Sequence, residues 1–208
     1  MNIKASFYDI FAYTIPGGML LLIILHGMKM FEFGDYFTIL QNANFFTLFT
    51  FGVTSHIVGF LIDPITYYLA KDFKSKEKTY STAYKEVISR NPDLDNFINP
   101  ADWAIWFAKI KKESIDVANE IDQFLAYSKM IRGVCFALLL SSLLLTFYVL
   151  LGKLNTYCLL SLPILGVLIL LSLRQAKKFK LGFYILIFET IISRKPPFTM
   201  PDEVKLNK

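Results

Sequence analysis

Residues 134 to 151 read VCFALLLSSLLLTFYVLL, a run without charge in which Ser141, Ser142 and Thr146 contribute hydroxyls. A helix that crosses the hydrocarbon core of a bilayer needs about 20 mostly apolar residues. This stretch therefore predicts a membrane-spanning helix, and three further windows meet or approach the same length. The four predicted spans cover residues 7–28, 45–68, 131–151 and 157–173.

The composition of the whole chain agrees with a membrane protein. Its 208 residues are 54% hydrophobic, with a mean hydropathy of +0.45, which is too apolar for an ordinary soluble domain. We therefore predict an all-α fold, a polytopic membrane protein with four transmembrane helices and a cytoplasmic helical module. No cleavable signal peptide is predicted, because the first apolar stretch carries Asp9 and Pro16 and no cleavage site follows it.

The positions of the basic residues predict the orientation of the spans. Lysine and arginine are frequent between the second and third spans and after the fourth, whereas the two other connections contain only Lys29 and Lys153. Positive loops stay in the cytoplasm. We therefore expect a multi-pass protein of the cell inner membrane with both termini cytoplasmic, and we assign the net charge of +5 to topology, with no direct contact to nucleic acid.

Four segments are expected along the chain. Residues 71–130 are polar and balanced in charge, which favours a folded, solvated module. The apolar run at 181–188 is too short to cross a bilayer and predicts an interfacial or docked helix. The expected segments are 1–70 with the first two spans, 71–130 as the cytoplasmic module, 131–175 with the last two spans, and 176–208 as interfacial helix and tail.

Two helices are expected in the module. One covers about residues 77–89, and a second begins at Asn99-Pro100, where asparagine caps and proline takes the first helical position, and continues toward the third span. The second carries an apolar stripe with heptad spacing. An intramolecular core is favoured for this stripe over an oligomer interface, because the stripe is short. Its aromatic residues Trp103 and Phe107, with the neighbouring Trp106, are the candidates for contact with a cytosolic partner.

The second span carries the most informative polar pattern. Gly52, His56, Gly59 and Asp63 are separated by four, three and four residues, so they share one helix face. Ionisable groups in hydrocarbon normally face a protein interior or a watery path, and glycines let another backbone approach closely. The face predicts either the lining of a pore or proton path, or a packed interface in which His56 and Asp63 bond to hydroxyls such as Thr14, Ser141 or Ser142.

The segment from Tyr8 to Gly18 is the second candidate site. It combines an aromatic belt with Asp9 and with the sequence Pro16-Gly17-Gly18, which predicts a kink or an irregular turn. Such a turn could act as a hinge or a gate. The alternative, which we favour, is an aromatic anchor on a kinked first helix.

The residues give little support to an enzyme. His26 and His56 have no histidine or carboxylate at metal-ligand spacing, and Cys135 and Cys158 lie in apolar runs where neither a disulfide nor a zinc site is indicated. Phosphate-binding loops, nucleophile elbows and dinucleotide fingerprints are missing from the sequence. We therefore expect a non-enzymatic protein without cofactor or metal.

The layout resembles a known group of proteins. Four spans, a modest cytosolic insert, a composition rich in Phe, Ile and Lys, and the stretch from Tyr8 to Gly18 resemble the small membrane proteins of prokaryotic phage-defence loci. These include the membrane accessory proteins of type VI-B CRISPR systems and the transmembrane effectors of nucleotide-signalling defence systems. The resemblance carries over no functional residue. It implies a protein that senses or permeabilises the inner membrane together with a cytosolic partner.

Three functions follow from these patterns. The first is an oligomeric membrane protein that forms or gates a pore, or perturbs the membrane, in antiviral defence. The second is a small ion- or proton-coupled transporter that uses His56 and Asp63. The third is a membrane-bound enzyme. We rank the pore first, because four spans are few for a substrate pathway within one chain.

Overall fold

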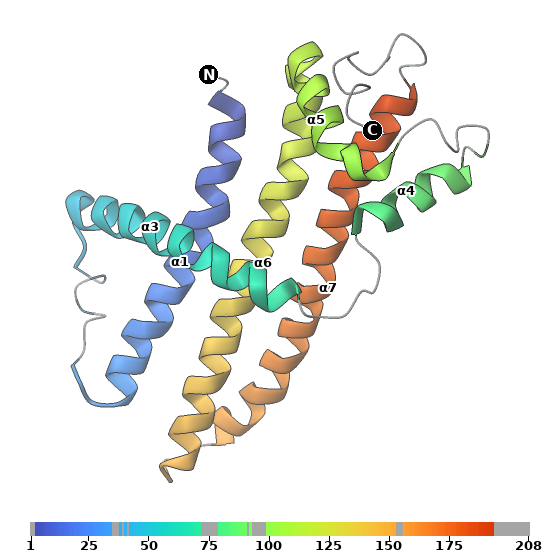
Figure 1. Cartoon of the computed structure of the whole chain (residues 1–208). Coiled ribbons are helices and arrows are strands. Elements are labelled where there is room, and N and C mark those ends of the chain that lie inside the picture. Colours follow the sequence, from blue (N-terminus) through green and yellow to red (C-terminus); the bar gives the residue numbers. More distant parts are fainter. Residues whose placement is uncertain are drawn as a thin grey trace. The chain divides into compact units, whose positions relative to one another are not determined.

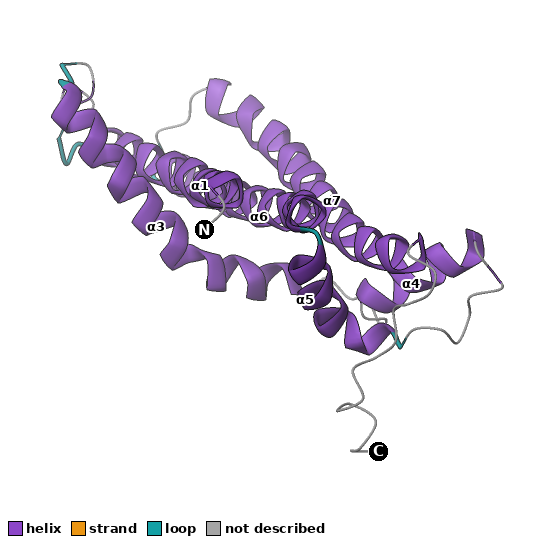
Figure 2. Cartoon of the chain, turned by 90° about the horizontal axis from the view of Figure 1, so that it is seen from above, coloured by secondary structure: helices purple, strands orange, loops and turns teal. Residues whose placement is uncertain are grey.

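The computed structural model describes residues 3–34, 38, 40, 42–71, 79–90, 92, 99–152 and 156–193. Every regular element in this part of the chain is a helix (Figures 1 and 2). The all-α prediction is therefore confirmed. The elements are α1 (Ile3–Met30), α3 (Phe45–Lys71), α4 (Thr79–Arg90), the 3₁₀ turn η2 (Pro100–Asp102), α5 (Trp103–Glu113), α6 (Ile115–Leu150) and α7 (Thr156–Ser193).

Four of these helices are long and apolar enough to cross a membrane. The qualifying segments are Ile10–Met30, Phe45–Tyr68, Ile115–Leu150 and Leu160–Ser193, and each overlaps one predicted span. Their outer faces carry large apolar side chains such as Phe49 and Leu61 on α3 and Ile164 on α7, which are more than half exposed. Such a surface is costly in water and suits hydrocarbon.

The chain divides into two compact units. Unit 1 comprises residues 1–74 and 125–179, and unit 2 comprises residues 75–124 and 180–208. Two helices contribute to both units, since α6 and α7 each continue without a break through a unit boundary. The apolar run at 181–188, expected as a separate interfacial or docked helix, is the last part of α7 and lies in unit 2.

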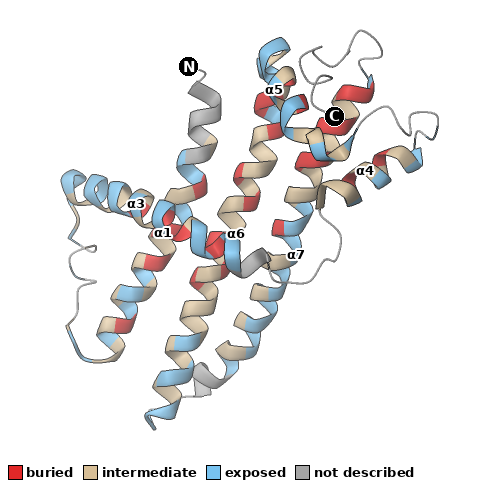
Figure 3. Cartoon of the chain, viewed as in Figure 1, coloured by how far each residue is buried: buried red, intermediate tan, exposed pale blue. Residues whose placement is uncertain are grey.

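Unit 2 has an aromatic core built on the end of α7. Buried residues gather on the last part of α7, as Figure 3 shows in red. Phe183 and Phe188 are buried, and Tyr84 of α4 lies edge-on to Phe188 with 5.6 Å between the ring centroids. Trp103 and Phe107 of α5 contact Phe183 at 5.9 and 5.5 Å. The apolar stripe of the module thus packs within this unit, as favoured, and the aromatic partners of Trp103 and Phe107 are Phe183 and Tyr184 of α7.

The second helix of the module begins as predicted but is interrupted. The Asn99 side chain accepts a hydrogen bond from the backbone N–H of Ala101, with Pro100 at the start of the turn. The expected long helix then breaks at Ser114, whose backbone is extended with φ −147° and ψ 95°. Helix α6 starts at Ile115 and continues into the third predicted span.

Unit 1 contains the paired middle portions of α6 and α7. The hydroxyl of Ser128 donates to the carbonyl of Ala176 at 3.0 Å, and both residues are buried. Further along, the Sγ atom of Cys135 lies 3.8 Å from the carbonyl oxygen of Ile169. The two other helices of unit 1, α1 and α3, cross one another, as Figure 1 shows. The candidate site lies at that crossing.

Candidate functional site

Two glycines bring α1 and α3 into backbone contact. A Cβ atom at Gly59 would overlap the carbonyl oxygen of Tyr13, and one at Gly17 would overlap the carbonyl oxygen of Ser55. Only residues without a side chain allow helices to approach this closely. The close approach predicted from the glycines of the second span therefore occurs at Gly59, and Gly17 of the first span meets it from the other side.

Pro16 joins the same contact to a third helix. Its side chain is fully buried, and a Cβ atom at Gly133 of α6 would lie 2.5 Å from the Cβ atom of Pro16. Helix α1 runs from Ile3 to Met30 without interruption, so the irregular turn considered for Pro16-Gly17-Gly18 does not form. The Gly18 backbone faces the Ser55 side chain. The Asp9 side chain lies outside the described residues.

His56 is bonded to a hydroxyl of the first helix. Its Nδ1 atom lies 3.3 Å from Oγ1 of Thr14, one of the partners considered from the sequence, and its ring is edge-on to Tyr13 at 5.7 Å. The Thr14 hydroxyl donates its single proton to the carbonyl of Ile10 at 2.7 Å. The Thr14 oxygen therefore links the imidazole ring of α3 to the Ile10 carbonyl of α1.

Asp63 is paired with an arginine that the sequence interpretation overlooked. Oδ1 of Asp63 lies 3.1 Å from Nη2 of Arg132, and the side chains are 25% and 9% exposed. The guanidinium of Arg132 also lies over the ring of Tyr67 at 5.5 Å, and its buried Nε has no hydrogen-bond partner in the described part of the chain. Asp63 thus meets a cation rather than the hydroxyls that were considered for it.

A second basic residue of α6 reaches the first helix. The ammonium group of Lys129 donates to the Tyr13 hydroxyl at 3.3 Å and lies 5.5 Å from the centre of the same ring. Lys129 and Arg132 are three residues apart, so they project from one face of α6. Through them α6 is bonded to α1 at Tyr13 and to α3 at Asp63.

We call this group the polar cluster. It brings together the side chains of three helices at the crossing. The sequence pointed to His56 and Asp63 as candidates and to Thr14 as a possible hydroxyl partner. Its members are Tyr13 and Thr14 of α1, His56, Asp63 and Tyr67 of α3, and Lys129 and Arg132 of α6.

The helix face of α3 that was predicted to be buried is buried only in part. No atom lies within 4 Å of a Cβ built at Gly52, which is therefore open. The residues of α3 that are buried in unit 1 are Ser55, Gly59, Ile62 and Thr66. His56 and Asp63 each lie one position along the chain from a member of this row, so they flank the tightest contact and keep partial exposure. The sequence spacing placed the groups on one side of the helix but could not locate the line of contact.

The arrangement can hold charge between three apolar helices. One carboxylate and two basic groups meet there, together with an imidazole and phenol hydroxyls. Among the described residues, no group of three histidine, cysteine or acidic side chains is close enough to hold a metal ion. The chemistry that the polar cluster offers is ion pairing and hydrogen bonding between helices, which can be made or broken as helices move.

The three aromatic candidates for a partner contact lie in unit 2. Trp106 is buried, with 2% of its surface exposed, and Trp103 and Phe107 contact Phe183. A partner would reach Trp106 only by displacing part of this core. Ile105, on the same helix, is a large apolar residue that is 39% exposed.

Comparisons with protein-family models, with curated proteins and with solved structures find no match for this chain. The resemblance of its layout to phage-defence membrane proteins therefore stays a prediction, and the function has to be argued from the polar cluster.

Proposed function

We propose that this chain is a non-enzymatic, oligomeric, multi-pass membrane protein that gates a pore, with unit 1 in the membrane and unit 2 on the cytoplasmic side. The observation that carries the proposal is the polar cluster. It places the Asp63–Arg132 ion pair between helices whose other faces are apolar. Ionisable groups are costly in hydrocarbon, and where they occur they usually serve a function.

The ion pair is the closed state of the proposed gate. While Asp63 and Arg132 neutralise one another, α3 is held to α6 and no uncompensated charge faces the apolar surroundings. Separating the two charges requires water around each of them. An opened cluster would therefore be lined by water, and neighbouring copies would supply the remaining walls of the pore.

Helix α6 gives the cytoplasmic unit access to this gate. Residues up to Phe124 of α6 belong to unit 2, and Lys129 and Arg132 follow within the next turns of the same unbroken helix. A partner that moves the first part of α6 would pull on both basic residues at once. The bonds to Tyr13 and to Asp63 would then break together.

The experiment is induced expression in a bacterial host with a membrane-potential dye. Asp63→Asn removes the charge that Arg132 neutralises, so we expect depolarisation in the absence of any trigger. The charge-reversed pair Asp63→Arg with Arg132→Asp restores attraction, and we expect it to return the potential toward that of the wild type. Membrane-fraction abundance of each variant is measured in parallel.

A matched control is available in unit 2. Glu189 pairs with Arg90 at 3.0 Å, but this pair is exposed on both sides. Exposed ion pairs contribute little to the stability of a protein. Glu189→Gln should therefore leave the membrane potential unchanged. Unchanged potential in every variant, at normal abundance in the membrane, contradicts the proposed gate. Saturable uptake of a solute without depolarisation would favour the transporter instead.

A further inference from the structure

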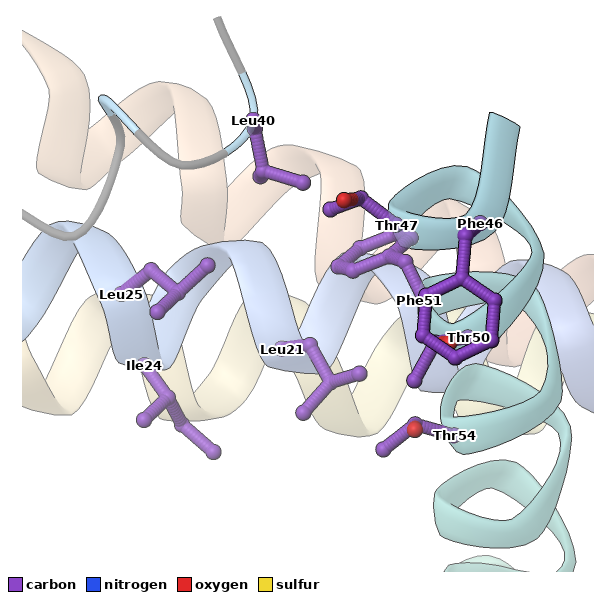
Figure 4. A pocket seen from close by; sticks show the side chains of 9 residues that line it. All are labelled: Leu21, Ile24, Leu25, Leu40, Phe46, Thr47, Thr50, Phe51 and Thr54. Atoms are coloured by element: carbon purple, nitrogen blue, oxygen red, sulfur yellow. The ribbon is translucent and has the colours of Figure 1, made fainter. Parts of the chain in front are cut away.

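An apolar groove lies beside the helix crossing in unit 1. It has a volume of about 420 Å³ and is bounded by Leu21, Ile24 and Leu25 of α1 and by Phe46 and Phe51 of α3 (Figure 4). Because the two helices touch at Gly17 and Gly59 and then diverge, the space between them widens away from the crossing. The groove is the wedge that this divergence leaves.

The chemistry of the groove selects an apolar guest. The residues that line it carry no charge, and its walls are hydrocarbon apart from three threonines. Its size falls within the range of small-molecule sites, about 300–1,000 Å³. Ile24 and Phe46 are themselves 42% and 74% exposed, so the groove opens onto the apolar outer surface of the helices. In a membrane, that surface faces acyl chains.

Two threonine hydroxyls line the groove without a hydrogen bond to the described part of the chain. Thr50 and Thr54 are four residues apart on α3 and form no hydrogen bond with any described residue. Other hydroxyls on these helices, such as those of Thr14 and Ser55, donate back to a carbonyl of their own helix. Thr50 and Thr54 therefore remain available to donate to an oxygen of a guest.

We propose that this groove binds one acyl chain of a bilayer phospholipid, with its ester oxygens bonded to Thr50 or Thr54. Apolar burial alone would not distinguish the groove from bulk lipid, because lipid tails are as apolar as its walls. Selectivity comes from the wedge shape and from the two hydroxyls. The inference rests on the membrane embedding proposed above and does not depend on the gate.

The test is photolabelling of the full chain in vesicles of phosphatidylethanolamine and phosphatidylglycerol. The probe is a phospholipid with a diazirine on its acyl chain, and labelled peptides are mapped by mass spectrometry. We expect strong labelling at residues 21–25 and 46–54, together with general labelling of the exposed face of α7. Thr50→Trp fills the groove and should abolish the first signal while leaving the second. Leu168→Trp, on α7, is the matched control and should change neither.

A shape-conserving variant tests the hydroxyls. Thr50→Val with Thr54→Val keeps the volume of both side chains, and we expect groove labelling to fall by about threefold for each hydroxyl that bonds the lipid. Thr146→Val removes a hydroxyl that bonds its own helix at Ser142 and should leave labelling unchanged.

The outcomes separate the groove from the membrane embedding. If α7 is labelled but the groove is not, the lipid site is wrong and the membrane embedding stands. The same conclusion follows if groove labelling persists in Thr50→Trp. A chain that labels nowhere overturns the embedding and the lipid site with it.

Discussion

Arg132 is buried and makes two interactions of different kinds. It pairs with Asp63, lies over the ring of Tyr67, and is 91% buried, since only 9% of its side chain is exposed. An arginine suits such a position because its planar guanidinium can bond a carboxylate and stack on an aromatic ring together, which a lysine ammonium does less well. The site therefore depends on the shape of the group as well as on its charge.

The residue scale gives the first stability prediction. Arg132→Gln leaves Asp63 without its cation, and we expect the free energy of unfolding in detergent to fall by about 3 kcal/mol, the lower end for a broken buried pair because Asp63 is partly exposed. Arg132→Lys keeps the charge, so we expect its loss of unfolding free energy to be less than half of the loss in Arg132→Gln. Thermal unfolding monitored by circular dichroism measures both. Equal stability of all three proteins would show that the pair contributes nothing to holding α3 against α6.

At the scale of the helices, much of the architecture follows from the sequence. The four long apolar helices come from hydropathy, and the start of the module helix comes from Asn99-Pro100. The length of α7 could not be predicted from the sequence, because the charged stretch from Arg174 to Lys180 suggests the end of a span. Arginine, lysine and glutamine are good helix formers, so the helix continues through these charges to Ser193.

The polar cluster shows a second limit of sequence interpretation. His56, Gly59 and Asp63 were found from their spacing within one helix. Arg132 lies 69 positions from Asp63, and only the tertiary arrangement joins the two. An unpaired acid in an apolar helix does indicate that a cation is nearby, and Arg132, at the start of the third predicted span, was the signal that could have been used.

The helix crossing provides a matched pair of glycines for the next prediction. At Gly59 an added methyl group collides with the Tyr13 carbonyl, whereas at Gly52 it meets open space. We expect Gly59→Ala to lower the free energy of unfolding by about 1–3 kcal/mol, because the Tyr13 backbone cannot move aside as a flexible side chain can. Gly52→Ala should be neutral or slightly stabilising. Denaturation in detergent compares the two, and equal effects would mean that α1 and α3 do not touch at Gly59.

At the scale of the whole molecule, the basic residues predict an orientation for the proposed membrane protein. The distribution of lysine and arginine predicts that both termini and unit 2 are cytoplasmic. Single cysteines can report this once Cys135 and Cys158 are replaced by alanine. We expect Lys74→Cys and Lys180→Cys to react with an impermeant maleimide only after the inner membrane is opened.

The same experiment contains its own control. Lys29→Cys and Lys153→Cys lie in the connections predicted on the opposite side and should react in intact spheroplasts. If residues 74 and 180 prove to lie on different sides, the number of crossings between them is odd, and the four-span topology is wrong.

The glycine contact between α1 and α3 also determines which motions this pair of helices permits. Because the backbones touch at Gly17 and Gly59, sliding either helix by one residue would drive a Cβ atom into the other, whereas a change of angle is opposed mainly by side-chain contacts such as that between His56 and Thr14. We therefore expect α1 and α3 to change their crossing angle about this contact and not to slide along one another. A change of the crossing angle alters the width of the groove beside the contact. A molecule bound in the groove would therefore limit how closely α1 and α3 can approach one another there.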